Sequence, residues 1–266
     1  MRTREGRPRI VVTRPTLTAA PLRRAIRRRG AEPLGLPGLA LEPAADPADA
    51  RRHLRAALSS QVWIFTSPAA VHFAWTLVPD LRLPQRISVV AVGRGTAQAL
   101  ARVGVTAIAP AGREDSEGML ALPVLGAVEG QTLALIGAPG GRDLLAPALH
   151  ARGATVQPVH VYRRTLPMWR PAQIDAFCRA EEPLATLVSS GEALDNLSRH
   201  LPPPASARLR GVPVVVSSER LAGLARDLRF GEILVARSPA PADLLDTALA
   251  RLQPGGEGRS RTVPVS

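Results

Sequence analysis

The sequence predicts an α/β protein made of two similar domains with parallel sheets, the first of which is interrupted by the second. Short runs rich in Val, Ile and Leu alternate with helical segments along most of the chain, which is typical of parallel α/β folds. The tripeptide Arg-Gly-Ala at 29–31 recurs at 152–154, each time between a helical and an extended stretch. A chain of 266 residues is long enough for two domains with substantial cores.

The repeat also predicts where the domains begin and end. If each domain holds one strand–helix–Arg-Gly-Ala unit and three further strand–helix pairs, the chain leaves the first domain early and returns to it late. The predicted boundaries are residues 1–35 and 166–252 for domain 1, 44–154 for domain 2, 36–43 and 155–165 for two linker strands, and 253–266 for a disordered tail rich in Gly, Arg and Ser. Because the repeated motif is short, chance similarity between two strand–helix units stays an alternative.

The first part of the chain has clear start and stop signals. We expect a strand at 10–13, a helix at 20–29 and an extended segment at 32–43. Asp46 followed by Pro47 is typical of a helix start, with Asp as the N-cap and Pro in the first turn, and this helix should run to about residue 58.

The middle and the last part repeat the same alternation. Predicted strands are residues 62–65, 87–92, 105–109, 131–136, 184–188, 212–216 and 232–236. Predicted helices are residues 69–77, 97–102, 118–125, 142–152, 192–200, 220–228 and 242–252. Thr66-Ser67-Pro68 is a second cap-and-proline start, and Pro123 should end or bend its helix.

Composition excludes several classes of protein. The chain has 34 basic residues, all of them arginine, against 22 acidic ones, giving a net charge of +12, which suits an acidic small molecule or a polyanion. The arginines are scattered and aromatic residues make up 3%, which argues against a stacking platform for single-stranded nucleic acid; a genome-wide bias toward arginine is the alternative explanation. A single cysteine, Cys178, excludes an internal disulfide and a cysteine-cluster metal site. Without an apolar run of membrane-spanning length or a secretory signal, we expect a cytoplasmic protein.

Hydroxyl or glycine clusters follow four of the predicted strands and precede helices. These clusters are Thr66-Ser67, Gly93-Arg94-Gly95-Thr96, Ser189-Ser190 and Ser217-Ser218. Ligands of open parallel sheets bind beyond the carboxyl ends of the strands, where helix N-termini attract anions. Each cluster alone is an ordinary helix cap, but two in each predicted domain favour a binding site. No dinucleotide fingerprint, P-loop or hydrolase elbow occurs, and the five histidines lack metal-ligand spacing.

Tyr162 is the only tyrosine of the chain and ends the predicted extended segment after the second Arg-Gly-Ala. A phenol can donate a proton weakly and can orient a departing hydroxyl by hydrogen bonding. A lone tyrosine at the end of an extended segment is, however, more often a core or interface residue.

The order and spacing of these motifs resemble the uroporphyrinogen-III synthase family over about residues 10 to 250. The motifs that carry the resemblance are Val-Thr-Arg-Pro at 12–15, Phe-Thr-Ser-Pro at 65–68 with Ala70-Val71, Ala-Val-Gly at 91–93 with Thr96-Ala97 and Leu100, Ser-Glu-Gly-Met-Leu at 116–120 with Leu122-Pro123, Gly-Gly-Arg at 140–142, Arg-Gly-Ala at 152–154, Val-Tyr-Arg-Arg at 161–164, Ser-Ser-Gly-Glu at 189–192 and Val-Ser-Ser-Glu-Arg-Leu-Ala at 216–222.

The resemblance implies two flavodoxin-like domains joined by a two-stranded β linker, and a cyclising hydro-lyase of porphyrin and heme biosynthesis. Such an enzyme converts hydroxymethylbilane into uroporphyrinogen III through a spiro-pyrrolenine, with inversion of ring D and without a metal or cofactor. The family's catalytic tyrosine matches Tyr162. Positions matching its substrate-binding cleft are Thr13, Arg14, Thr66, Ser67, Gly93, Thr96, Ser189, Ser190 and Ser218.

The expected partner is therefore the small molecule hydroxymethylbilane, with transient contact to hydroxymethylbilane synthase. We expect a monomer that binds neither nucleic acid nor a membrane. Two other functions stay open at this point: a noncatalytic two-domain sensor for a tetrapyrrole or another polycarboxylate, and a nucleic-acid-associated protein that uses its positive charge.

Overall fold

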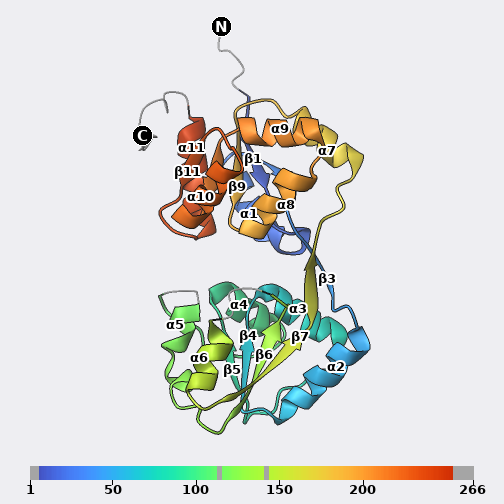
Figure 1. Ribbon diagram of the computed structural model, residues 1–266, viewed down its shortest axis with the longest axis vertical. Helices are drawn as coiled ribbons and strands as arrows, with labels where there is room; N and C mark the ends of the chain where they lie inside the picture. Colours follow the sequence, from blue (N-terminus) through green and yellow to red (C-terminus); the bar gives the residue numbers. More distant parts are fainter. Residues whose placement is uncertain (1–5, 113–115, 141–143, 254–266) are drawn as a thin grey trace. The chain divides into compact units, whose positions relative to one another are not determined.

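The computed structural model describes residues 6–112, 116–140 and 144–253 (Figure 1). The chain forms two compact units, unit 1 from residues 1–40 and 165–266 and unit 2 from residues 41–164. Both units are α/β with parallel sheets, so the predicted fold class is confirmed, and the unit that contains both chain ends is built from two separate segments. Of the predicted tail at 253–266, residues 254–266 lie outside the described part of the chain. No helix within the described residues is long and apolar enough to cross a membrane.

Unit 1 is built on a five-stranded sheet in the order β11-β10-β9-β1-β2, in which all neighbours are parallel. Its strands are β1 (Arg9–Val12), β2 (Glu32–Gly35), β9 (Leu184–Val188), β10 (Val214–Val216) and β11 (Ile233–Val235). Its helices are α1 (Thr16–Arg28), α7 (Pro171–Cys178), α8 (Gly191–His200), α9 (Pro203–Gly211), α10 (Glu219–Asp227) and α11 (Pro241–Leu252).

Helices cover both faces of this sheet because successive strand side chains point to opposite sides. Ile10 and Val12 pack with α1 and α11 in one cluster, while Val11 packs with α7 to α10 in another. Burial on both faces explains why the strands are continuously apolar rather than alternating.

Unit 2 is built on a four-stranded parallel sheet in the order β5-β4-β6-β7. Its strands are β4 (Val62–Phe65), β5 (Ser88–Ala91), β6 (Thr132–Gly137) and β7 (Thr155–His160). Its helices are α2 (Pro47–Ala56), η1 (Ala57–Ser59), α3 (Pro68–Leu77), α4 (Arg94–Arg102), α5 (Ser116–Leu120), η2 (Pro123–Leu125) and α6 (Leu145–Ala151). Trp63 and Phe65 of β4 pack with α2, α3 and α4, whereas Val62 and Ile64 pack with α5, η2 and α6.

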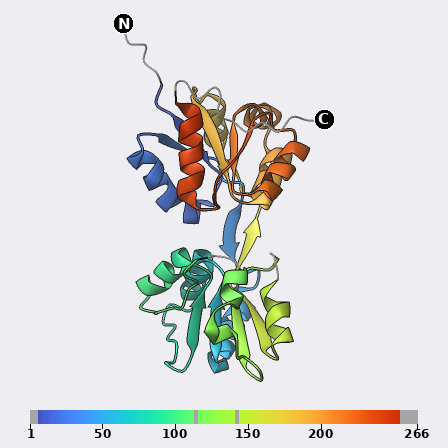
Figure 2. The same ribbon diagram turned by 90° about the vertical axis from the view of Figure 1, so that its left-hand side faces the viewer.

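Two short strands, β3 (Ala40–Pro43) and β8 (Tyr162–Thr165), pair as a separate ribbon where the chain passes between the units. Figure 2 shows them as arrows of opposite direction, one blue and one yellow. Arg163 of β8 forms an ion pair with Glu42 of β3 at 2.5 Å. The ribbon is shorter than expected from the sequence: residues 155–160, expected in a linker strand, form β7 and pair with β6 along its whole length. Extended, Val-containing sequence fits an edge strand and a linker equally well, so the sequence pattern could not separate them.

The internal repeat extends to the register of both sheets. Arg9 of β1 stands opposite Glu32 of β2, and Thr132 of β6 stands opposite Thr155 of β7. On the other side of the same two strands, Ile10 of β1 stands opposite Ala185 of β9, and Leu133 of β6 stands opposite Val62 of β4. Subtracting 9 from 132, 32 from 155 and 62 from 185 gives 123 each time. Each unit therefore combines the first part of one repeat with the later part of the other.

One other predicted element is wrong, and two helices of the structure were not predicted. Residues 105–109, predicted as a strand, contribute a single bridge between Ile108 and Val90, because Gly104 and Pro110 leave too short a stretch for a ladder. Helices α7 and α9 were not predicted. Both begin with a proline at N1 and lie among further prolines. A sequence so rich in proline is also typical of a loop.

Candidate functional site

The predicted site residues of unit 2 lie at the carboxyl edge of its sheet. Thr66 and Ser67 follow β4, and Gly93 follows the neighbouring strand β5. Because β4 and β5 are parallel neighbours, these two turns leave the sheet at the same edge. The helices that begin there, α3 and α4, pack against the same sheet face.

Ser67 and Tyr162 form the one polar contact that joins two predicted site residues among the described part of unit 2. The Ser67 Oγ lies 3.1 Å from the Tyr162 hydroxyl, although the residues are 95 positions apart in the chain. Ser67 Oγ also accepts the Ala70 N–H at 3.0 Å and is the N-cap of α3. Pro68 at N1 fixes the helical backbone angle at this start and has no N–H to satisfy.

The ring of Tyr162 is a core group. It is 6% exposed and stacks on Phe73 of α3, with ring centroids 5.4 Å apart and planes 13° from parallel. Stacking and the hydroxyl contact together fix both the position and the rotation of the phenol. Phe73 was not singled out from the sequence, and its only signal is a place on the buried face of α3.

The other predicted residues of unit 2 are less available to a ligand. The Thr66 hydroxyl donates to the Ile136 carbonyl at 3.2 Å, and a Cβ at Gly137 would lie 2.5 Å from that hydroxyl oxygen. The Thr96 side chain is 2% exposed, so it packs inside the unit. Gly93 precedes α4 with no side chain to cap it, which leaves the start of this helix suited to an anion.

In unit 1, Arg14 lies at the corresponding edge of the sheet, directly after Thr13 and β1. It lines a small pocket with Leu22, Leu187, Val188, Ser189, Pro241 and Leu244. Its guanidinium has no hydrogen-bond or ion-pair partner within residues 6–112, 116–140 and 144–253, and burial lowers the pKa of Arg14 from its ordinary value. The Ser189 side chain is exposed beside it. A half-buried cation without a counter-charge is a favourable place for a carboxylate.

The other predicted site residues of unit 1 use their hydroxyls in hydrogen bonds to the backbone of that unit. The Thr13 hydroxyl is 3% exposed and donates to the Leu187 carbonyl at 2.7 Å, so its only proton is already used. Ser190 caps α8 by accepting the Ala193 N–H at 3.3 Å, and Ser218 caps α10 by accepting the Leu221 N–H at 3.4 Å. Among the predicted residues of this edge, the polar groups of Arg14 and Ser189 are therefore the ones that stay available.

The two units thus offer different chemistry. Unit 2 supplies a phenol–serine pair that can donate a proton, and unit 1 supplies a cation that can hold an acid group. Among the described residues no group of His, Cys, Asp and Glu side chains is arranged to hold a metal ion.

Comparison with known proteins identifies the family. The family model for uroporphyrinogen-III synthase HemD matches residues 20–246. The uroporphyrinogen-III synthase of Escherichia coli (strain K12) is 32% identical over 231 residues, covering 85% of this chain and 94% of that protein. The synthase of Salmonella typhimurium is 36% identical over 148 residues, which cover 55% of this chain and 60% of that protein.

Solved structures with the same fold come from the same family. A mutant uroporphyrinogen III synthase from the extremely thermophilic bacterium Thermus thermophilus superposes with a TM-score of 0.57 at 21% identity, over 92% of this chain and all of that one. The synthetase from Helicobacter pylori 26695 superposes with a TM-score of 0.59 at 13% identity, over 92% of this chain and 99% of that one. The family model and the Escherichia coli relative each span most of the sequence, and the chain belongs to the uroporphyrinogen-III synthase family.

Proposed function

We propose that this protein is a uroporphyrinogen-III synthase that converts hydroxymethylbilane into uroporphyrinogen III and water. The observation that carries the proposal is the match to the Escherichia coli enzyme, which extends over 94% of that protein. Two features of the described residues support it, the phenol–serine pair and an Arg14 guanidinium that has no partner among them, because the reaction needs a proton donor and its substrate is a polycarboxylate.

Substrate binding is proposed to rely on positive groups at the sheet edges. Hydroxymethylbilane carries eight carboxylates, and a net charge of +12 favours its approach. In unit 1, Arg14 and Ser189 would hold one carboxylate. In unit 2, the uncapped start of α4 after Gly93 would receive another through main-chain N–H groups.

The proposed chemistry is dehydration followed by ring closure. The terminal hydroxyl leaves as water with a proton from the Ser67–Tyr162 pair, which produces an azafulvene. The substituted carbon of ring D then attacks, and the spiro-pyrrolenine opens and recloses with that ring inverted. Because an activated bilane can also close unaided to the type I isomer, the main contribution of the protein is to hold the two ends in the reacting geometry.

An isomer-resolved assay tests this function. Purified protein is incubated with freshly made hydroxymethylbilane, and uroporphyrinogens I and III are separated and quantified. Type III product supports the synthase. Type I product alone, with the bilane still bound, indicates the sensor instead, and retention on DNA at physiological salt indicates the nucleic-acid-associated protein. The family match favours neither of these two alternatives.

Tyr162→Phe removes the phenol oxygen and keeps the ring that stacks on Phe73. We expect type III formation to slow by roughly 10- to 100-fold, within the range for loss of a proton donor, while the melting temperature changes by only a few degrees. Unchanged turnover would remove Tyr162 from the mechanism.

We also propose that the enzyme works in the cytoplasm as a monomer and makes transient contact with hydroxymethylbilane synthase. The supporting argument is chemical: the substrate closes spontaneously, so a short transfer path reduces loss to the type I isomer. Co-sedimentation of the two purified enzymes, with and without substrate, tests the contact.

A further inference from the structure

We propose that Ser67, rather than Tyr162, is the group that touches the departing hydroxyl, and that Tyr162 acts through Ser67. The inference rests on the proposed synthase function and concerns the order of the two groups in the proton path. It starts from their unequal exposure. Tyr162 is 6% exposed with its ring in the core, whereas Ser67 is half-buried at the end of β4, where ligands of parallel sheets bind.

The hydrogen-bond inventory of Ser67 favours this order. A serine hydroxyl has one proton to donate and can accept two hydrogen bonds. One acceptor position receives the Ala70 N–H, which can only donate. The second lies 3.1 Å from Tyr162, and a phenol, as the stronger acid, is the better donor of the two hydroxyls. With both acceptor positions filled, the Ser67 proton is left for a ligand.

In such a chain of hydrogen bonds, the last hydroxyl becomes a stronger hydrogen-bond donor. Each hydrogen bond polarises the next, so a serine hydroxyl that accepts from both an amide and a phenol becomes a better donor itself. The α3 N-terminus adds a positive field at the same oxygen. The arrangement therefore directs proton-donating power toward the Ser67 hydroxyl.

The second copy of the repeat shows that capping alone needs no phenol. Adding 123 to 67, 70 and 73 gives Ser190, Ala193 and Asn196, and Ser190 caps α8 through the Ala193 N–H as Ser67 caps α3 through Ala70. Subtracting 123 from 162 gives Leu39, an apolar residue that is 6% exposed. Unit 2 thus keeps the cap and adds a phenol behind it, which indicates a second task for Ser67.

The proposed step balances as follows. The bond between the terminal carbon and its hydroxyl oxygen breaks, and the electron pair leaves on the oxygen. That oxygen takes the Ser67 proton and departs as water, and Tyr162 returns a proton to Ser67. The pyrrole nitrogen loses its own proton as the azafulvene forms, which replaces the proton taken from the phenol.

A double-mutant cycle with Ser67→Ala and Tyr162→Phe tests the order, with type III formation as the readout. If Tyr162 acts through Ser67, we expect Ser67→Ala to slow kcat by about 100-fold, Tyr162→Phe to slow it less, and the double variant to be no slower than Ser67→Ala alone. Ser67→Thr keeps a hydroxyl on the cap and should recover most of the activity. A double variant slowed by the product of the two single effects would show that the phenol acts directly and would overturn the inference.

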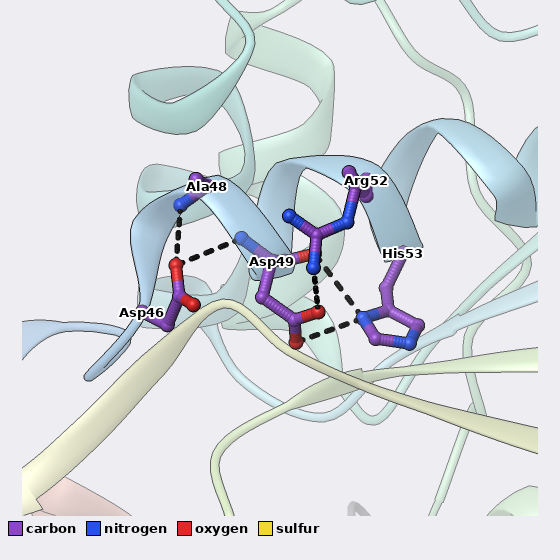
Figure 3. Close-up of polar contacts among 5 residues, drawn as sticks. All are labelled: Asp46, Ala48, Asp49, Arg52 and His53. Atoms are coloured by element: carbon purple, nitrogen blue, oxygen red, sulfur yellow. Dashed lines mark hydrogen bonds and ion pairs between the residues drawn. The ribbon is translucent and has the colours of Figure 1, made fainter.

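Asp46→Ala is the matched control for the loss of a helix cap. Asp46 caps α2 in the same unit by accepting the N–H groups of Ala48 and Asp49, as Figure 3 shows. This variant should lower the melting temperature by about 2–4 °C and leave turnover unchanged. If Ser67→Ala resembles it in both respects, Ser67 is only a cap and the inference fails. Absence of type III product from the unaltered protein would instead contradict the proposed function.

Discussion

Replacing Arg14 with methionine is expected to weaken substrate binding without weakening the fold. Methionine keeps an unbranched apolar side chain in the pocket beside Leu187 and removes the charge. The guanidinium is half-buried and has no partner among residues 6–112, 116–140 and 144–253, so the folded protein gains little from it. Most arginines buried to this extent are paired, and loss of such a residue normally destabilises.

Arg14→Met is expected to weaken substrate binding and to stabilise the fold, and the sizes of both effects follow from the surroundings of Arg14. Losing one charge-assisted contact with a substrate carboxylate costs about 1.5–3 kcal/mol, which corresponds to a roughly 10- to 100-fold rise in KM. Removing a desolvated cation raises the free energy of unfolding by up to ~1 kcal/mol, or about 2–4 °C in melting temperature. The same desolvation disfavours the charged form of the guanidinium, and burial therefore lowers the pKa of Arg14.

The assay combines steady-state kinetics of type III formation with urea unfolding of the ligand-free protein. Arg24→Met is the control, because Arg24 is an exposed arginine of α1, and the same substitution there should change neither KM nor stability measurably. The reasoning is refuted if Arg14→Met unfolds at a lower urea concentration while its KM stays normal. That outcome would make Arg14 a structural residue.

Two further predictions concern glycines. Gly30 and Gly153 are repeat partners with φ of +79° and +80°; Gly30→Ala should cost about 1 kcal/mol in unfolding free energy and Gly153→Ala more, because only the second Cβ meets a neighbour, Glu129 Cγ at 3.0 Å. Equal losses in the two unfolding curves would contradict this account. Gly137→Ala should cost about 1–3 kcal/mol, since the new Cβ would displace the Thr66 hydroxyl from its hydrogen bond, and a melting temperature equal to that of the parent would exclude such a clash.

The sequence was sufficient to predict most strands and most helices because these depend on local pattern. Continuous apolar runs predicted the strands, and cap-and-proline pairs predicted the starts of α2 and α3. Asp46 accepts two first-turn N–H groups and Ser67 accepts one, as their residue types favour. The starts of α7 and α9 were missed because their prolines also occur in loops, and residues 155–160 were misplaced because strand propensity does not identify the partner strand.

The candidate site was less predictable, because its contacts join distant parts of the chain. No local pattern in the sequence brings Tyr162 to Ser67, and only the structure shows Phe73 against the same ring. Residue type alone also grouped hydroxyls that differ in availability. The Thr13 hydroxyl already donates a hydrogen bond to the Leu187 carbonyl, whereas the Ser189 side chain is exposed. Accessibility and hydrogen-bond state therefore decide which members of a motif can meet a ligand.

The internal repeat gives a physical reason for placing the proton chemistry in unit 2. Both units begin a helix after an equivalent strand with a serine cap, at Ser67 and at Ser190, so capping is a property of the repeated fold. Only in unit 2 does a tyrosine stand behind the cap, where the other copy has Leu39. Burying a phenol is favourable only if its hydroxyl finds a partner, and a partner that is itself a helix cap is held in place by the backbone. In unit 2 the buried phenol, stacked on Phe73 where the other copy has Asn196, therefore places a second hydroxyl behind a cap that the repeated fold already provides.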